Sequence, residues 1–285
     1  IAHIAQKFGV LIETLNSNST GSIIDKSNCL PEEFETVTRS KEDLAALLYT
    51  SGTTGKSKGA MLTQTNLLSN GNVLMSEWQF SKKDVLLHAL PLFHTHGLFV
   101  ATNVILSAGG SMIFLPKFDL DNIITNLPKS SAMMGVPTFY TRLLEDIRFT
   151  RNLVDHMRLF VSGSAPLLSE THTQFEKITG HRILERYGMT ETNMNTSNPY
   201  NGERRAGTVG LPLPGVELKI TNSDTGEELS FNKIGQIEVR GVNVFKGYWK
   251  MPEKTKAELR KNGFFITGDV GKIDEDGYIH ILGRD

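Results

Sequence analysis

This sequence has a single cysteine, no long apolar run and almost no net charge. Each of these features excludes a class of protein. The single cysteine, Cys29, excludes an internal disulfide and favours a reducing compartment, so we expect a cytoplasmic protein. The most apolar stretch, residues 98–106, is too short to span a bilayer, so no membrane insertion is expected. With 30 basic and 31 acidic residues and no long basic run, nucleic acid is not an expected partner.

The length of the chain allows a large core or two subdomains that share one. A sequence of 285 residues is long enough for either arrangement. Neither end carries a helix cap or a polar tail, and the last residues directly follow the strand-like segment YIHILG. We therefore expect these residues to be a piece of a longer protein.

Short apolar segments alternate with segments of helical spacing over most of the chain, which predicts an α/β layered fold with a largely parallel sheet. The expected strands are residues 45–50, 85–90, 111–115, 132–136 and 159–162. The expected helices are residues 64–77, 120–127, 138–148 and 169–179. We therefore expect parallel-rich sheets flanked by helices, as an α/β core that covers residues 1–206.

The pattern changes after about Gly207. Three segments alternate as half-exposed strands do, and Asp-Thr-Gly and Asp-Gly turn signals separate them. These segments are residues 216–221, 235–241 and 277–282. They predict a smaller, β-rich and barrel-like subdomain over residues 207–285.

The segment YTSGTTGKSKG, residues 49–59, follows a strand candidate and ends in a way that suggests a Walker-type phosphate loop. Such a loop needs a glycine five positions before its Gly-Lys-Ser. That position holds Thr50, and the nearest glycine is Gly52, so the Walker interpretation fails. Glycine backbone, several hydroxyls and the two lysines Lys56 and Lys58 still favour an anion site over an ordinary polar turn.

The motif TSGTTGKSKG resembles the phosphate loop of the adenylate-forming superfamily, which includes acyl-CoA synthetases, luciferases and adenylation domains. Ser57 stands where the family pattern has proline, and the loop lysine is then Lys58. Five further motifs follow in the family's order: PLFHTHG at 91–97, SGSAP at 162–166, RYGMTE at 186–191, TGD at 267–269 and GRD at 283–285. Such an ordered set is very improbable by chance, and it implies that superfamily's layered N-terminal domain.

The resemblance also implies the residues of the site. Nucleotide-binding positions would be Thr50, Ser51, Gly52, Thr53, Thr54, Gly55, Ser164, Ala165, Pro166, Glu185, Arg186, Tyr187, Gly188, Met189, Asp269 and Arg284. Catalytic positions would be Lys58, Thr190 and Glu191. In the family, the tyrosine stacks on adenine, the threonine bonds the α-phosphate, and the glutamate holds Mg²⁺.

Several of these residues also have ordinary interpretations when they are taken singly. Glu191 could be a solvated acid at a helix start, stabilised by the helix dipole. Asp269 and Arg284, which the resemblance places on the ribose hydroxyls, would more often be surface or turn charges. The six motifs together favour the functional interpretation over the ordinary one.

The family chemistry, an acid activated with ATP to an acyl-adenylate and then passed to CoA, requires little general-base catalysis. A carboxylate is already ionised at neutral pH. The reaction depends on positioning and on neutralising the phosphates, which Mg²⁺, a loop lysine and hydroxyl donors supply. The absence of a recognisable Ser-His-Asp set agrees with this chemistry.

The acid that is activated is suggested by Arg142, in GVPTFYTR. Pro137 should begin a helix there, with the arginine in its first two turns, near the strand ends where ligands gather. Arginine grips a carboxylate in a bidentate pair, although a salt bridge with Glu145 or Asp146 is equally consistent with the sequence. The surrounding text resembles the malonyl-CoA synthetases, in which the residues matching Arg142 and Ser164 hold the distal carboxylate of malonate or methylmalonate.

His94 and His96 form a His-x-His pair, which on a strand would point both rings to one side. No further cluster completes a metal site, and the resemblance places both histidines beside the acyl pocket. Arg186 is a second candidate for binding the acid, although its expected place at a helix start could equally be structural. His88, His172 and His181 are expected to be ordinary structural or surface residues.

The expected function is therefore that of an ATP-dependent, AMP-forming acid–CoA ligase for a small dicarboxylic acid. A medium-chain or aryl acyl-CoA synthetase is the main alternative, and a catalytically inactive nucleotide-binding relative is a remote one. The family's mobile C-terminal domain and its lysine follow the hinge motif at which this sequence ends. We expect residues 1–285 alone to bind nucleotide weakly and not to complete thioester formation.

Overall fold

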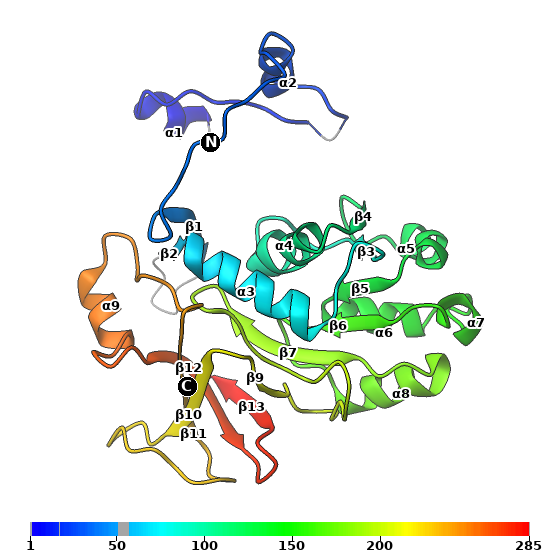
Figure 1. Cartoon of the computed structure of the whole chain (residues 1–285), viewed down its shortest axis with the longest axis vertical. Coiled ribbons are helices and arrows are strands. Elements are labelled where there is room, and N and C mark those ends of the chain that lie inside the picture. The colour runs from blue at the N-terminus through cyan, green and yellow to red at the C-terminus, as the bar shows by residue number, and fades with distance from the viewer. Residues whose placement is uncertain (1, 17, 51–56, 285) are drawn as a thin grey trace. The chain divides into compact units, whose positions relative to one another are not determined.

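A computed structural model describes residues 2–16, 18–50 and 57–284 of the chain (Figure 1). Its contacts divide the chain into two units, residues 1–39 and residues 40–285. The first unit holds two short helices, α1 (Ala2–Lys7) and α2 (Ser22–Ser27). Within it, Glu13 accepts hydrogen bonds from Ser22 and Lys26, which ties an extended segment to the second helix.

The second unit is built on a seven-stranded sheet with the strand order β4-β3-β5-β6-β7-β8-β9. Its strands are β3 (Val85–His88), β4 (Ser111–Phe114), β5 (Ala132–Gly135), β6 (Leu159–Ser162), β7 (Leu184–Met189), β8 (Asn193–Ser197) and β9 (Leu211–Pro212). Neighbours from β4 through β7 pair in parallel, whereas β7, β8 and β9 pair antiparallel. The parallel-rich α/β sheet predicted from the sequence is confirmed.

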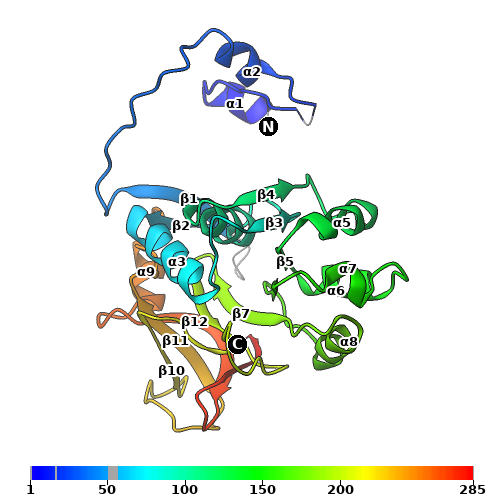
Figure 2. The same cartoon turned by 45° about the vertical axis from the view of Figure 1, so that its right-hand side comes forward.

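Helices cover both faces of this sheet, and Figure 2 shows them on its two sides. The helices are α3 (Gln64–Glu77), η1 (a π-helix, His96–Ala101), α4 (Thr102–Ser107), α5 (Leu120–Asn126), η2 (a 3₁₀ helix, Leu127–Lys129), α6 (Pro137–Leu144), α7 (Arg151–Val154) and α8 (Ser169–Thr179). Because side chains alternate along a strand, Leu86 packs with α3 and α4, whereas its neighbour Leu87 packs with α5 to α8. This two-sided burial explains why β5 and β6 are buried along their whole length.

Local signals in the sequence account for several helix ends. Thr63 caps α3 by accepting a bond from the Asn66 N–H, and the Asn66 side chain bonds back to Thr63. Pro137 stands at the first turn of α6, where its missing N–H costs nothing. Gly180 ends α8 in the left-handed conformation with φ of 80°, which favours glycine. The expected bounds of α3, α8 and β6 agree with the observed bounds.

A smaller antiparallel sheet follows in the chain, with the linear strand order β10-β11-β12-β13. These strands are β10 (Val216–Thr221), β11 (Gly235–Gly241), β12 (Phe265–Ile273) and β13 (Ile279–Arg284), with α9 (Pro252–Glu258) between the second and third. The β-rich character predicted for this stretch is therefore observed as a four-stranded meander. The predicted division into residues 1–206 and 207–285 stays a prediction.

A separate two-stranded ribbon joins β1 (Leu44–Thr50) to β2 (Lys58–Thr63) in antiparallel register. The expectation that residues 45–50 form a strand of the parallel sheet is wrong. A parallel crossover needs a dozen or more residues, and only residues 51–57 separate these strands. On its inner side, β2 packs with the smaller sheet through Ala60 and Leu62.

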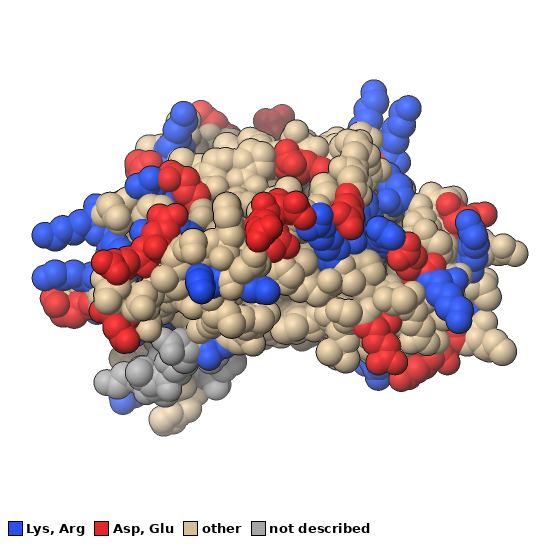
Figure 3. All heavy atoms as spheres, turned by 90° about the horizontal axis from the view of Figure 1, so that it is seen from below, with Lys and Arg blue, Asp and Glu red and all other residues tan. Residues whose placement is uncertain are grey.

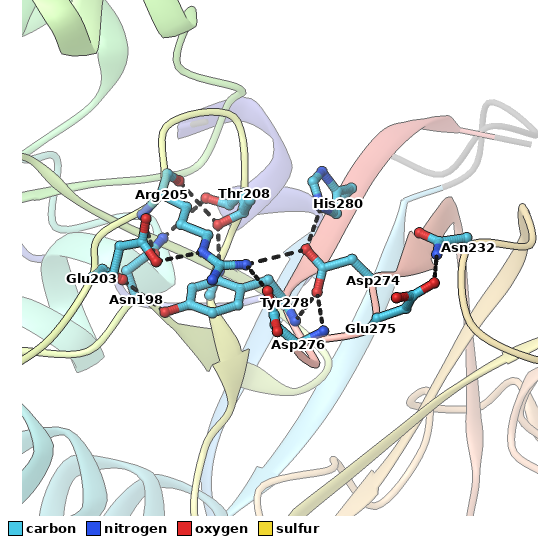
Figure 4. A network of polar contacts seen from close by, with 11 residues as sticks. Asn198, Glu203, Arg205, Thr208, Asn232, Asp274, Glu275, Asp276, Tyr278 and His280 are labelled. Atoms are coloured by element: carbon cyan, nitrogen blue, oxygen red, sulfur yellow. Dashed lines mark hydrogen bonds and ion pairs between the residues drawn. The ribbon is translucent and has the colours of Figure 1, made fainter.

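A polar network joins the loop after β8 to the turn between β12 and β13 (Figure 4). Arg205 donates to Asp276 at 2.8 Å, its guanidinium lies 4.1 Å from the Tyr278 ring centroid, and the Tyr278 hydroxyl donates to the Glu203 carbonyl.

On the face shown in Figure 3, acidic and basic side chains are interspersed rather than gathered by sign. In the described part of the chain, no helix is long and apolar enough to cross a membrane.

Candidate active site

A cavity of about 1070 Å³, the main cavity, opens at the carboxyl ends of the parallel strands. Segments that leave β3, β5 and β6 line it, and this is the edge where open α/β sheets bind their ligands. Of the residues predicted from the sequence, it contains Thr50, Lys58, His94, His96, Ser164, Arg186, Gly188, Met189, Thr190, Glu191 and Arg284. Ser51, Gly52, Thr53, Thr54 and Gly55 lie outside the described residues.

A smaller cavity of about 370 Å³, the side pocket, shares residues with the main cavity. The shared residues include Ser164, Arg186, Gly188, Met189 and Arg284. The side pocket adds the predicted residues Ala165, Pro166, Glu185, Tyr187 and Asp269. Motifs far apart in the sequence therefore meet around two neighbouring cavities.

Tyr248 lies at the centre of a polar cluster in the wall of the main cavity. Its hydroxyl is 2.9 Å from Glu191 Oε1 and 2.7 Å from Glu258 Oε2, and Lys58 Nζ lies 3.3 Å from the same hydroxyl oxygen. A hydroxyl has one hydrogen, so it donates to one carboxylate at a time while it accepts from the lysine. The buried hydroxyl of Thr50, in the same wall, has no hydrogen-bond partner among the described residues.

Glu191 is buried, with 4% of its surface exposed. It lies in the tight turn between β7 and β8, and its carbonyl accepts a bond from the Phe245 N–H. The alternative of a solvated acid at a helix start is therefore wrong. Burial is the largest influence on this carboxyl group and raises its pKa, whereas the Tyr248 hydroxyl and the Lys58 charge act in the opposite direction.

Arg186 is a buried arginine that lines both cavities. The residue is 3% exposed, and neither its Nε nor its Nη2 has a hydrogen-bond partner among the described residues. Its burial lowers its pKa to about 9. Gly163 lets the side chain pass, since a Cβ at that position would lie 2.3 Å from the guanidinium carbon. A buried cation without a partner is costly, so the site is suited to an anion.

His96 and Ser164 stand beside this arginine in the main cavity. The Ser164 hydroxyl is 3.2 Å from His96 Nδ1, and the serine takes a φ of 71°, in the left-handed region that few side chains adopt. Burial, followed by the nearby Arg186 charge, lowers the pKa of His96 well below its usual value. His96 Nε2 has no partner among the described residues, so the neutral ring still offers one free nitrogen.

Asp269 connects the two sheets at the side pocket. Its carboxylate accepts a bond of 2.5 Å from the Tyr187 hydroxyl and one of 2.9 Å from Arg284 Nε. Burial and the adjacent Asp269 charge raise the pKa of Tyr187, so its hydroxyl keeps the hydrogen that it donates. Glu185, which also lines the side pocket, is buried against His172, with 3.1 Å between Oε1 and Nδ1.

Arg142 lies outside the main cavity. It is on α6, as expected from Pro137, but its guanidinium packs 5.5 Å from the Phe118 ring centroid. It lines a separate pocket of about 490 Å³ together with Glu145 and Asp146. Phe118 and Lys117 line both this pocket and the main cavity, so they belong to the wall that separates Arg142 from the main cavity.

The two histidines of His-x-His do not lie on a strand. His94 is exposed in a turn against Phe93, whereas His96 begins the π-helix η1. The rings therefore do not share a face as they would on a strand. In the described part of the chain, no group of three or more His, Cys, Asp or Glu residues could hold a metal ion. His88 is buried and bonds to Gly97 O and Thr102, which agrees with the structural role expected for it.

Tyr248 and Glu258 are not among the site residues predicted from the sequence. Both line the main cavity, in segments GYW and KAEL that match none of the motifs. Tyr248 is 57 positions from Glu191 and 190 from Lys58 along the chain. The loop between β11 and α9 packs against both β2 and the turn between β7 and β8, and no local sequence signal predicts these contacts.

Residues 4–249 match the model of the AMP-binding enzyme family. The chain belongs to this family. It is 42% identical to a malonate–CoA ligase of Arabidopsis thaliana, over 94% of this chain and 46% of that protein. The crystal structure of ATP-bound MatB from Rhodopseudomonas palustris is similar with a TM-score of 0.97 and 61% identity, over 99% of this chain and 56% of that one.

A malonyl-CoA ligase in a ternary product complex with methylmalonyl-CoA and AMP also matches this AMP-binding chain. The TM-score is 0.80 and the identity 42%, over 86% of this chain and 54% of the other. The chain therefore spans about half the length of the curated relatives it matches. The resemblance inferred from the six motifs is confirmed at the level of the family and its fold.

Proposed function

We propose that the protein carrying this chain is an acid–CoA ligase that activates malonate or methylmalonate with ATP and transfers the acyl group to CoA. The observation that carries the proposal is the buried guanidinium of Arg186, whose Nε and Nη2 atoms have no partner among the described residues, in the same cavity as Lys58 and Glu191. One part of the cavity suits a phosphate chain with a cation, and another suits an anionic group on the acid. The similarity to malonate–CoA ligases supports the same substrates.

The reaction has two steps in this proposal. One carboxylate oxygen of the acid attacks the α-phosphorus of ATP, the bond to the β-phosphate oxygen breaks, and pyrophosphate leaves. The CoA thiolate then attacks the acyl carbon and AMP leaves with the electron pair of the broken acyl–oxygen bond. The first step needs orientation and charge stabilisation rather than a base, because the attacking carboxylate is already ionised.

We assign the phosphate side of the cavity to Lys58, Thr190 and Glu191. A lysine ammonium is a mobile point charge suited to phosphate oxygens, and the threonine hydroxyl can donate to the α-phosphate. The residues present fit Mg²⁺, because that ion prefers oxygen ligands and is commonly held by one or two carboxylates together with substrate phosphates. Glu191 would hold it, with its carboxylate turned into the cavity, and the ion would neutralise charge on the phosphates.

We assign the second carboxylate of the acid to Arg186, with His96 and Ser164 as neighbouring hydrogen-bond partners. An arginine–carboxylate pair is bidentate, and the unpaired Nε and Nη2 atoms match that geometry. Arg142 stays a proposed contributor, as the resemblance suggested, but it would need the Phe118 ring to move aside. The second carboxylate of a small diacid thus has a cationic partner, and the first is left to attack the α-phosphorus.

We assign the nucleoside to the side pocket. The Tyr187 ring supplies a stacking surface for adenine, and segment 164–166 lines the same pocket. Asp269 can accept bonds from the ribose hydroxyls, and Arg284 shares that carboxylate. A ribose there would take over contacts that the Tyr187 hydroxyl and Arg284 now make with Asp269.

The exposed single thiol of Cys29 fits a reducing compartment, which we propose to be the cytoplasm.

A medium-chain or aryl acid is the second candidate, and one observation favours it. Four phenylalanines, Phe93, Phe114, Phe118 and Phe139, are among the residues that line the main cavity. Aromatic walls suit a hydrophobic acid, whereas malonate is small and doubly charged. Arg186 opposes this alternative, because an apolar acid would leave its guanidinium buried and unpaired.

The deciding experiment is acid-dependent pyrophosphate release by the full-length protein. Malonate and methylmalonate should give kcat/KM values at least about 100-fold above those of acetate, octanoate and coumarate, since a buried arginine discriminates strongly against acids that leave it unpaired. Omission of the acid is the control and should abolish release. A preference for any of the monocarboxylates would reject the dicarboxylate assignment.

A further inference from the structure

Lys58 is held away from solvent by two side chains that match none of the sequence motifs. Its Nζ lies 3.7 Å from Glu258 Oε2 and 3.3 Å from the Tyr248 hydroxyl. The ammonium also lies 4.6 Å from the centroid of the Tyr248 ring, within cation–π range. The side chains of Lys58 and Glu258 are 14% and 21% exposed, so bulk water screens this pair less than a surface pair.

Glu258 is itself fixed in place. It is the last residue of α9, its Oε2 accepts from the Tyr248 hydroxyl at 2.7 Å, and its Oε1 pairs with Lys254 at 2.7 Å. The helix is tied to the same tyrosine, because the Tyr248 N–H donates to Thr255 Oγ1 at 2.9 Å. The carboxylate therefore stands as a fixed anion facing a lysine whose stem is flexible.

We propose that Glu258 is a positioning residue, which holds the Lys58 ammonium when no nucleotide is bound and from which the triphosphate must take it. The inference rests on the proposed function, which gives Lys58 to the phosphates. Both Glu258 and Lys58 line the main cavity, so a triphosphate there competes with Glu258 for the ammonium. Lys254 and Tyr248 remain with Glu258 after the exchange, so its charge is not left without partners.

The test is equilibrium binding of α,β-methylene-ATP with Mg²⁺ to the full-length protein, in two backgrounds. Glu258→Gln should lower the Kd about three- to tenfold when Lys58 is present, because a competing anion is removed from the lysine. The same change in a Lys58→Met background should alter the Kd less than about twofold, since no ammonium is left to release. Glu253→Gln, an exposed acid in the first turn of the same helix, is the matched control and should leave the Kd unchanged.

Three results would overturn the inference. An equal gain in both backgrounds would mean that Glu258 only repels the nucleotide as a nearby charge. A weaker affinity of Glu258→Gln for the analogue would mean that the Glu258 carboxylate supports nucleotide binding. If the parent protein does not bind the analogue measurably, the triphosphate does not compete with Glu258 for the Lys58 ammonium. Thermal unfolding checks each variant, and Glu258→Ala replaces Glu258→Gln if the glutamine variant unfolds early.

The binding assay contains no acid, so its result is independent of which acid the protein activates. If the analogue binds as expected but malonate fails to release pyrophosphate, the dicarboxylate assignment falls and the role of Glu258 stands. If malonate is activated and the two backgrounds give equal gains in affinity, the dicarboxylate assignment stands and the proposed role of Glu258 falls.

Discussion

Arg186 allows a test of substrate choice at a single side chain. Its Nε and Nη2 atoms have no partner among the described residues, whereas Arg142 is exposed and packs on Phe118. We expect Arg186→Met to lower kcat/KM for malonate by about 100-fold or more, because a desolvated bidentate pair is lost. Arg142→Ala should cost about tenfold or less.

Steady-state pyrophosphate release with malonate measures both variants, and acetate serves as the control acid. Acetate has no second carboxylate, so its weaker activation should change little in either variant. A larger loss from Arg142→Ala than from Arg186→Met would place the second carboxylate toward α6, with Phe118 moved aside.

The loop lysines give a second residue-scale prediction, which separates the adenylate-forming loop from a Walker loop. Lys58 lines the main cavity, so Lys58→Ala should slow adenylation by about 100-fold or more through lost stabilisation of the phosphates. Lys56→Ala should cost less than about tenfold and is the matched control. Acid-dependent pyrophosphate release in single-turnover conditions measures both. A reversed order would restore the Walker interpretation.

The sequence could indicate which motif residues lie near one another better than it could indicate which side chains they contact. Motifs between positions 50 and 284 meet at the two cavities, because their order and spacing are those of one family fold. The contacts of Lys58 with Tyr248 and Glu258 were not predictable, since they depend on how two distant loops pack. Arg142 shows the same limit: its helix was predicted, but the direction of its side chain was not.

At the scale of elements, the prediction worked where periodicity and end signals agreed. Helix α3 has both a capping threonine and a helical apolar pattern, and its predicted bounds agree with the structure. The π-helix at His96 was missed because His-x-His was considered on a strand, and the π-helix hydrogen-bond pattern has no signature in the sequence. The ribbon of β1 and β2 was missed because the short connection was weighed only as a phosphate loop.

Asp84 fixes the starts of three parallel strands and gives an element-scale prediction. It precedes β3 and accepts bonds from Arg158, which precedes β6, and from Ser131, which precedes β5. Burial raises the pKa of Asp84, but the bonds from Arg158, Ser131 and the Ser81 N–H outweigh burial, so its pKa is lowered overall. Asp84→Asn should therefore lower the free energy of unfolding at pH 7 by about 2 kcal/mol, a value reduced for the partial exposure of Arg158.

The pH dependence of that loss follows from the direction of the shift. A carboxyl group whose pKa is lower in the folded state stabilises the fold above its unfolded pKa of about 4 and loses this contribution as the pH falls through the folded pKa. The parent protein should thus lose more stability than Asp84→Asn between about pH 5 and pH 3. Urea unfolding across this range measures the difference, and parallel curves for the two proteins would refute the assignment.

At the scale of the whole second unit, the fold class was predicted because an α/β pattern followed by a β-rich pattern has few layered solutions. The way in which the two sheets are held together was not predicted. Backbone bonds of 2.9 Å run from Val209 N to Ile279 O and from Ile279 N to Gly210 O, and Arg205 adds side-chain contacts beside them (Figure 4). These pairings join segments that no local pattern relates.

Arg205 is the side chain whose removal should loosen this connection. It pairs with Asp276 across the two sheets and stacks on Tyr278, which follows in the same turn. Arg240 is the matched control, because it also pairs with an acid, Glu217, and stacks on an aromatic ring, but within the smaller sheet.

Arg205→Ala should raise amide exchange in residues 274–281 by about fivefold, since local opening there becomes easier, whereas Arg240→Ala should leave that segment unchanged. Hydrogen exchange followed by mass spectrometry measures both, and equal exchange in the two variants would mean that Arg205 does not hold this turn in place.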